Sequence, residues 1–200
     1  MNHSVAKFDR RLWVVFALGG LLFLMTWLST LRDRDRQQST SFRMPRRLAP
    51  AFRLYDQNSQ LVNLTAYLNR HRIVLVFFDG QASPLNDVVL KSLHEQQDRL
   101  AEADYQIFGI STALPQQNRA AIGDDFVFPL LSDPAAIQPG SVHRTWGCLR
   151  PPNSQNSEAA TVPKVFVIDR LGRVNWNNSW PASVERTKDF SRRLLAGEFD

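Results

Sequence analysis

Residues 12–31 form a run of twenty residues, LWVVFALGGLLFLMTWLSTL, that contains no charged side chain. At about 1.5 Å per residue, a helix of this length spans roughly 30 Å, which is the thickness of a bilayer hydrocarbon core. Trp13 and Trp27 lie toward the two ends of the run, where indole rings favour the headgroup region. The run therefore predicts a single transmembrane helix, with residues 1–11 as its N-terminal flank.

A cleaved signal peptide is the alternative interpretation of this run. The run is longer than the usual apolar part of such a peptide, and no small-x-small cleavage site follows it, which favours an uncleaved anchor. Its N-terminal side carries Lys7, Arg10 and Arg11, whereas six arginines lie between residues 32 and 47. The positive-inside rule therefore gives a slight preference for a cytoplasmic location of the residues that follow.

The formal net charge of +5 is concentrated at the N-terminal end of the chain. Residues 1–47 carry nine Lys/Arg against three Asp/Glu, or +6, and the remaining residues have a net charge of −1. Binding to nucleic acid requires a basic face on the folded body, so no nucleic-acid partner is expected. Residues 32–48 are polar, basic and without periodic hydrophobicity, which predicts a tether to a folded domain at 49–200.

The domain alternates between strand-like and helix-like segments, which is typical of an α/β protein. The continuous apolar run 73–78 predicts a central strand buried on both faces. Pro84 suits the first turn of a helix, whose buried stripe would contain Leu85, Val89, Leu93 and Leu100. The other expected elements are a hairpin at 52–55 and 61–64, strands at 105–110, 164–168 and 173–176, a short helix at 116–122, an apolar segment at 126–130 and a loop at 132–161. A closing helix is expected to begin near Pro181 and to turn Val184, Phe190 and Leu194 inward.

Four segments in order along residues 49–176 narrow the choice of fold. They are APAFRLYDQNSQLVNLTAY, IVLVFFDGQASPLND, FGIST with DDFVFPLLSDP, and VPKVFVIDRLGRV. Together they resemble the peroxiredoxin and alkyl hydroperoxide reductase family, the AhpC/TSA or redoxin family. The resemblance implies a thioredoxin-like fold, a central mixed sheet flanked by helices, and an antioxidant peroxidase chemistry.

The residues that would carry that chemistry are missing. In the family, the active loop reads PxxxTxxC, and its cysteine thiolate attacks the peroxide. On that pattern, Asp79 replaces the proline, Ser83 the threonine and Asn86 the cysteine, while Pro163 replaces an assisting arginine. An amide cannot act as the thiolate does, so no catalytic residue is expected at these degenerate positions.

The related CxxC oxidoreductases place their two cysteines where Ser83 and Asn86 stand, so this branch of the superfamily also has no thiol here. Pro163 does fit that branch, because thioredoxin folds carry a cis-proline just before the corresponding strand. The resemblance therefore predicts a cis Val162–Pro163 bond.

Cys148 is the one cysteine of the chain, so no intrachain disulfide can form. It lies between Arg144 and Arg150, cations that would lower the pKa of the thiol if they were close to it. His143 is the nearest histidine in sequence. Cys148 is thus the candidate thiol for a redox function, and a buried, inert cysteine is the competing interpretation.

Other polar and aromatic residues carry weaker signals. Ser83 and Asn86 are expected at a helix N-terminus, either as ligand contacts or as an N-cap and a first-turn residue. No metal site is expected, because the histidines show no metal-binding spacing; they are His3, His71, His94 and His143. Trp146, Trp176 and Trp180 are interpreted as packing residues rather than as a groove.

These observations favour a membrane-anchored, non-catalytic peroxiredoxin-like module that binds a protein partner and holds no cofactor. One alternative is a thiol-dependent oxidoreductase that uses Cys148. Another is a small-molecule site in the former active-site pocket, with Ser83 and Asn86 as its polar contacts.

Overall fold

The computed structural model describes residues 47–81, 83–122, 126–150, 159–179 and 184–199. The predicted transmembrane helix at 12–31, the flank at 1–11 and the tether up to residue 46 lie outside these ranges. None of the helices within the described ranges combines the length and the apolar character that crossing a bilayer requires.

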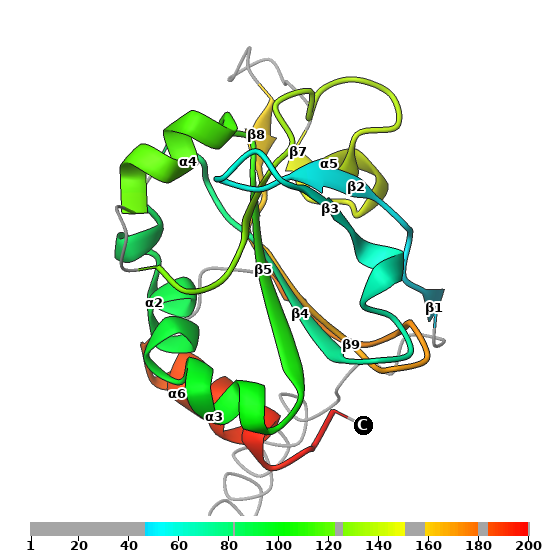
Figure 1. Cartoon of the computed structure of the whole chain (residues 1–200), viewed down its shortest axis with the longest axis vertical. Helices are drawn as coiled ribbons and strands as arrows, with labels where there is room; N and C mark the ends of the chain where they lie inside the picture. The colour runs from blue at the N-terminus through cyan, green and yellow to red at the C-terminus, as the bar shows by residue number, and fades with distance from the viewer. Residues whose placement is uncertain (1–46, 82, 123–125, 151–158, 180–183, 200) are drawn as a thin grey trace, which may run out of the picture. The chain divides into compact units, whose positions relative to one another are not determined.

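Eight of the described strands form one sheet in the order β1-β10-β9-β4-β5-β6-β2-β3 (Figure 1). At its centre, β4 (Arg72–Phe77) runs parallel to β5 (Tyr105–Ser111) and antiparallel to β9 (Lys164–Ile168). The five apolar residues from Ile73 to Phe77 are all buried, which confirms the predicted central strand. β6 (Leu130–Ser132) continues the sheet parallel to β5.

Both edges of the sheet are built from antiparallel pairs. On one side, β2 (Arg53–Tyr55) and β3 (Leu61–Asn63) form the expected hairpin, with Tyr55 opposite Leu61. The Asp56 carboxylate accepts hydrogen bonds from the backbone N–H groups of Asn58 and Gln60, which closes the hairpin turn. On the other side, β10 (Arg173–Ser179) pairs with β9 and with the short β1 (Arg47–Leu48).

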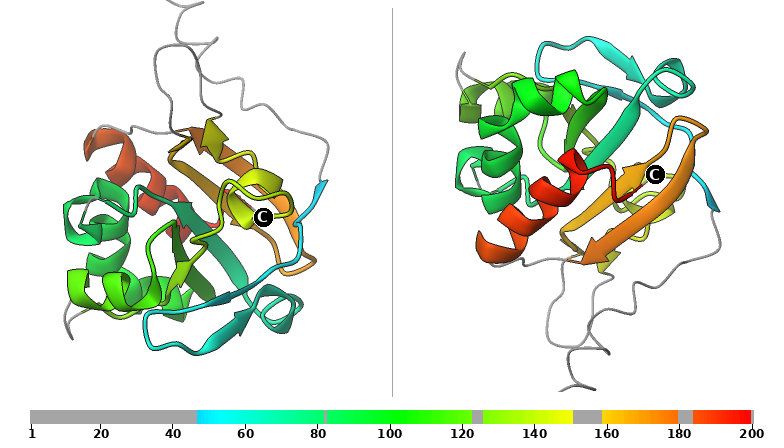
Figure 2. Two further views of the ribbon diagram at one scale, coloured as in Figure 1. Left: turned by 90° about the horizontal axis from the view of Figure 1, so that it is seen from above. Right: turned by 90° about the horizontal axis from the view of Figure 1, so that it is seen from below.

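Helices cover one face of the sheet, as the two views in Figure 2 show. They are α2 (Val88–Glu95), α3 (Gln97–Glu102) and α6 (Val184–Leu195), while α4 (Pro115–Ile122) packs near the end of β6. The opposite face is covered by the β2–β3 hairpin and by the segment containing α5 (Val142–Thr145). A separate two-stranded sheet joins β7 (Leu149–Arg150) to β8 (Ala160–Thr161).

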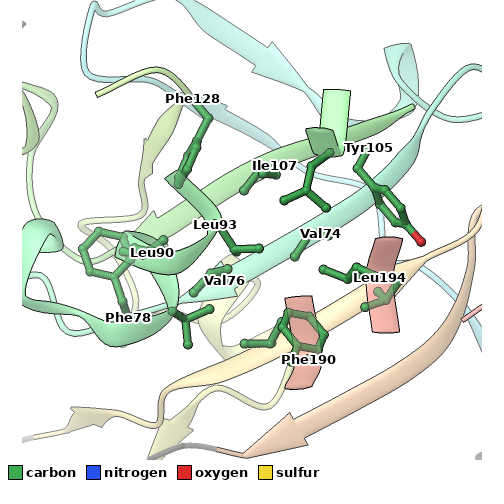
Figure 3. Packing of buried hydrophobic residues seen from close by; sticks show 14 of the residues in the cluster. Val74, Val76, Phe78, Leu90, Leu93, Tyr105, Ile107, Phe128, Phe190 and Leu194 are labelled. Atoms are coloured by element: carbon green, nitrogen blue, oxygen red, sulfur yellow. The ribbon is translucent and has the colours of Figure 1, made fainter. Parts of the chain in front are cut away.

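The two-residue repeat of β4 divides the core into two clusters. Val74 and Val76 belong to the cluster under the helices, together with Leu90 and Leu93 of α2 and Phe190 of α6 (Figure 3). The neighbouring residues of β4 point to the other cluster, beneath the hairpin and α5: Ile73, Leu75 and Phe77. The sheet therefore separates two apolar layers that do not share side chains.

The predicted helix that begins at Pro84 is wrong in its boundaries. Residues Pro84–Asn86 form one turn of 3₁₀ helix, and α2 begins only at Val88. Leu85 is consequently 43% exposed, outside the buried stripe where it was expected, whereas Val89, Leu93 and Leu100 are buried. The apolar segment at 126–130 leads into β6, which begins at Leu130.

Candidate functional site

The loop that follows β4 and leads to α2, residues 79–87, is the candidate site of the sequence analysis. The Asp79 side chain accepts a hydrogen bond from the backbone N–H of Gln81 at 3.0 Å and so starts the turn that a proline makes in the family pattern. Gly80 lies against the end of β5, since a Cβ there would be 2.8 Å from the backbone nitrogen of Ala113. Any larger residue at position 80 would push the loop away from the sheet.

The residue that caps α2 is Asp87 and not Ser83. The Asp87 carboxylate accepts hydrogen bonds from the N–H groups of Val89 at 2.9 Å and Leu90 at 3.0 Å. Burial raises the pKa of Asp87 above its ordinary value, and the two backbone hydrogen bonds offset only part of this effect. Ser83 makes no capping bond; its hydroxyl donates to the carbonyl of Ala121 in α4 at 3.4 Å. Ser83 thus stands at the N-cap position of the 3₁₀ turn Pro84–Asn86, which contains Asn86, whereas the N-cap of the longer helix α2 is Asp87.

Ser83 lines an open hollow of about 720 Å³ between the loop and α4, which we call the loop hollow. The described residues that form it are small or polar, and none carries a charge or an ionisable nucleophile: Gly80, Gln81, Ser83, Thr112, Ala113, Gln117, Ala120 and Ala121. The residues of such a wall can bind a ligand through hydrogen bonds and through a complementary shape. The wall holds no group that can attack a peroxide.

A buried polar network fixes α4 as the far wall of the loop hollow. The Ser111 hydroxyl donates to the side-chain oxygen of Asn118 at 3.0 Å, and the Asn118 amide donates to the Ser132 hydroxyl at 3.0 Å. All three side chains are buried. Because the network joins the ends of β5 and β6 to the middle of α4, it holds the position of the helix. Sequence analysis missed this network, since a lone Asn in a polar helix gives no signal of its own.

Asn86 does not share the loop hollow with Ser83. Its side chain is exposed and borders a different hollow of about 480 Å³, against α2 and α6, together with Lys91 and Lys188. The small-molecule alternative requires Ser83 and Asn86 to contact the same ligand. The two residues border different hollows, so the structure does not bring them together. Pro163 stands one residue before Lys164, which pairs with Phe77 at the end of β4 where the loop begins.

Cys148 lies on the other face of the sheet, in the cluster beneath the hairpin. A Schellman motif ends α5 and turns the chain inward, with Gly147 in the left-handed conformation at φ +66. In this motif the N–H of Gly147 donates to the carbonyl of Arg144 at 3.1 Å, and that of Cys148 to His143 at 2.7 Å. The side chain of Cys148 is thereby placed in the core with no exposed surface.

The thiol of Cys148 is held in its protonated form. Burial raises the pKa of Cys148 to about 12, against a smaller lowering by the charge of Lys164. The thiol donates a weak hydrogen bond to the carbonyl of Trp146 at 3.6 Å. The flanking Arg144 does not act on the sulfur as proposed: its guanidinium is exposed and donates to the carbonyl of Ile137 at 3.2 Å. A buried, neutral thiol is a poor nucleophile, because the reactive species is the thiolate.

A buried hydrogen-bonded pair that sequence analysis did not identify stands beside Cys148. One carboxylate oxygen of Asp133 accepts hydrogen bonds from both the backbone N–H and the ring Nδ1 of His143, each at 2.8 Å. His143 is fully buried, and its ring packs edge-on against Phe77 with centroids 5.2 Å apart. The pair links the loop after β6 to α5 and so anchors the Cys148 turn. The separation of ten positions between the partners hides this pairing in the sequence.

The remaining histidines and tryptophans serve packing and ion pairing. His71 lies 2.7 Å from a carboxylate oxygen of Asp104, and His94 stacks on Phe126 at 5.0 Å. Trp176 stacks on Phe190 at 4.8 Å. Within the ranges that the structure covers, no three His, Cys, Asp or Glu side chains come together as a metal site would need. Trp180 and His3 lie outside those ranges.

Three comparisons with known proteins bear on this site. Residues 45–177 match the model of the AhpC/TSA family. Alkyl hydroperoxide reductase E of Mycobacterium tuberculosis is 31% identical over 131 residues, which cover 64% of this chain and 80% of the relative. Peroxiredoxin Bcp of Escherichia coli is 34% identical over 87 residues, covering 43% of this chain and 55% of the relative.

The fold agrees with the sequence match. The crystal structure of peroxidoxin BcpB from Mycobacterium tuberculosis superposes with a TM-score of 0.64 at 21% identity, over 76% of this chain and 96% of that one. That of a PrxQ mutant from Xylella fastidiosa gives a TM-score of 0.63 at 15% identity, over 78% and 99%. From the family match over residues 45–177 and the thioredoxin-like architecture, it follows that this chain belongs to the AhpC/TSA family of peroxiredoxin-like proteins.

Proposed function

We propose that this chain is a non-catalytic, membrane-anchored peroxiredoxin-like module that binds a protein partner through the loop hollow. The observation that carries the proposal is the state of the two candidate positions for sulfur chemistry. Position 86 holds an exposed amide, and Cys148 is fully buried on the opposite face of the sheet with a pKa of about 12. The relatives named peroxidases and reductases belong to the same family, but none of the described residues of this chain can act as a reactive thiolate.

The loop hollow suits an uncharged segment of polypeptide. Gln81 and Gln117 border it with amide groups, and Ser83 and Thr112 with hydroxyl groups, all of which are complementary to the polar groups of a peptide backbone. Because none of the described lining residues is charged, they offer an ionic ligand no counter-charge. Leu114 is 47% exposed close to the same wall and offers an apolar contact at the rim.

The alternative function, an oxidoreductase that uses Cys148, requires a thiol that a peroxide or a disulfide can reach. Purified full-length chain is therefore expected to consume peroxide no faster than buffer does, with and without the substitution Cys148→Ala. Turnover that survives removal of the thiol would overturn the non-catalytic role altogether. Turnover that disappears with the thiol would establish the Cys148 alternative.

A photocrosslinking amino acid at position 117 tests the binding surface in the intact membrane. The expected result is a defined adduct from position 117 that is lost when Ala120→Arg fills the loop hollow. Ala101→Arg is the matched control, because Ala101 is equally an exposed helical alanine but lies in α3, away from the hollow. An adduct that both substitutions leave unchanged would contradict the proposed surface.

The membrane anchor is proposed from the uncharged run at 12–31, and the cytoplasmic side from the distribution of arginines around it. Alkaline carbonate extraction of membranes is expected to leave the full-length chain in the pellet. Deletion of residues 1–31 is expected to release the domain. Protease added to sealed, right-side-out vesicles should then spare the domain, whereas cleavage there would place it on the outer side.

A further inference from the structure

A third hollow lies at the edge of the sheet where β1 pairs with β10. Its volume is about 200 Å³, and Trp146, Phe166 and Val174 form its apolar walls. We call it the strand hollow. It shares no lining residue with the loop hollow, and none of its residues has entered the proposed function.

Two cations border the strand hollow without a carboxylate to neutralise them. The Lys164 ammonium donates to the backbone carbonyl of Gly147 at 2.6 Å, and Arg47 lies on the neighbouring β1. Among the described residues, no Asp or Glu lines this hollow or pairs with either cation. Two like charges at one small concavity attract an anion, and the fork of an arginine suits carboxylate and phosphate oxygens.

The walls of the strand hollow are aromatic and apolar. The rings of Trp146 and Phe166 meet edge to face with centroids 4.9 Å apart, and both residues are at least nine-tenths buried. Leu48, at the rim, is 68% exposed. The indole N–H of Trp146 is buried and has no acceptor among the described residues, which is rare for a buried donor.

We propose that the strand hollow binds a small organic anion in which a carboxylate or phosphate is joined to a short apolar chain. The oxyanion contacts Arg47 and Lys164, the two cations at the border of the hollow. The apolar chain packs on Phe166 and toward Leu48. A volume of about 200 Å³ corresponds to roughly seven water molecules, so the part that is enclosed is small. A free short-chain acid and the anionic end of a membrane lipid share this chemistry.

Isothermal titration of the full-length chain in neutral-detergent micelles tests the proposal, with hexanoate as the probe. Hexanol, which has no charge, and inorganic phosphate, which has no apolar chain, are the comparison ligands. Hexanoate is expected to bind at least about tenfold more tightly than either, because each lacks one half of the recognition. Equal affinity for hexanoate and hexanol would overturn the role of the two cations, and equal affinity for hexanoate and phosphate that of the apolar walls.

Substitutions locate the binding. Arg47→Gln and Lys164→Gln are each expected to weaken hexanoate binding about tenfold, since each removes one charge-assisted hydrogen bond. Lys91→Gln is the matched control, because Lys91 is an exposed lysine on α2 outside this hollow. Arg47 is exposed and distant from the core, so its replacement leaves the fold intact even if that of Lys164 does not. Equal binding by Arg47→Gln and the original chain would overturn the site.

A second readout reports on the indole. In the amide spectrum of labelled protein, the signal of the Trp146 side-chain N–H, assigned from Trp146→Phe, is expected to shift when hexanoate is added, because the Trp146 ring lines the hollow. Repeating the titration in micelles doped with phosphatidylglycerol separates the two sources of ligand. A lower apparent affinity for hexanoate identifies an anionic lipid as the competing occupant, and an unchanged affinity identifies a free acid. An indole signal that does not respond to saturating hexanoate would place the binding elsewhere and refute the proposal.

Discussion

The loop at 79–87 and the turn at 141–148 meet the end of β4 from opposite faces of the sheet. The loop follows Phe78 toward the helices, whereas His143 and Trp146 of the turn pack on the ring of Phe77. In the loop, the polar side chains of Gln81 and Asn86 face solvent. In the turn, Ser141, His143 and Cys148 are all buried. The two segments that the sequence singled out thus have opposite characters.

This difference shows what burial does to a reactive residue. Cys148 has the chemistry for redox reactions and the wrong surroundings, because its thiol is enclosed and its pKa is raised. Asn86 is exposed, as a group that attacks a peroxide would have to be, but it has the wrong chemistry, because an amide does not ionise there. A functional assignment requires residue and environment together, and here no described residue of either segment combines them.

The largest expected effect is on thiol reactivity, and it can be measured by moving the thiol between the two segments. In the double variant Asn86→Cys, Cys148→Ala, an aromatic disulfide reagent should modify the loop thiol rapidly. Native Cys148 should react at least about 10³-fold more slowly, because its pKa is about 12 against an ordinary 9.0 and each unit lowers the thiolate tenfold. Comparable rates would mean that the 141–148 turn opens readily, and the contrast between the regions would disappear.

The next effect concerns the anchor of the turn. Asp133→Ala leaves the ring Nδ1 and the backbone N–H of His143 without an acceptor in a buried place. The expected loss is about 3 kcal/mol in the free energy of unfolding, measured by denaturant titration. Asn86→Ala in the exposed loop is the comparison and should change this free energy by less than about 0.5 kcal/mol. Similar losses for the two variants would contradict the assignment of the turn as the structural region.

A smaller loss is expected at the glycine that directs Cys148 inward. Gly147→Ala should lower the free energy of unfolding by about 1 to 2 kcal/mol, because the left-handed conformation is unfavourable for a residue with a Cβ. The nearest atom to that Cβ is the Lys164 nitrogen at 3.8 Å, so the loss is conformational and not a clash. Gly147→Asn, which tolerates this conformation, should lose less than the alanine variant. The reverse order would rule out the backbone explanation.

The smallest effect is at the cap of α2. Asp87→Ala should cost about 1 kcal/mol, whereas Asp87→Asn keeps the cap and should be close to neutral. Since the pKa of Asp87 is raised in the folded state, the folded chain holds this proton more tightly than the unfolded chain. Stability from this group is therefore lost as pH rises above the ordinary value of 3.8. Thermal unfolding across this range should show that dependence in the original chain and not in Asp87→Asn.

Continuous apolar runs and family phrases were enough to predict most of the fold. The run 73–78 and the residues KVFVI of the phrase VPKVFVIDRLGRV correspond to β4 and β9, because strands buried on both faces show as continuous apolar runs. The end of the same phrase marks the start of β10, which follows the turn at Asp169–Gly172. The start of α2 is misplaced in the sequence prediction, since serine and aspartate are both good N-cap residues and only the hydrogen bonds of the folded chain show that Asp87 makes the cap. Because α2 begins only at Val88, Leu85 lies before the helix, and its side chain is exposed.

The surroundings of the site residues could not be predicted in the same way. The neighbours of Cys148 in sequence suggested arginines, whereas its electrostatic partner is Lys164, sixteen residues away on β9. The pairing of Asp133 with His143 and the network around Asn118 likewise depend on contacts between separate elements. A single sequence reveals periodic patterns along the chain. Contacts between residues of separate elements follow no such period, so they cannot be predicted from these patterns.

The short β1 has a mechanical consequence. Its described residues are Arg47 and Leu48, and the amide of Ala49 bonds to the carbonyl of Gly172 just beyond it. A pulling force applied to the N-terminal end of the domain would strain these few hydrogen bonds first and peel the strand from β10 while the central strands stay intact. Because Arg47 and Leu48 also border the strand hollow, tension along the chain would dismantle one side of that hollow before it unfolds anything else.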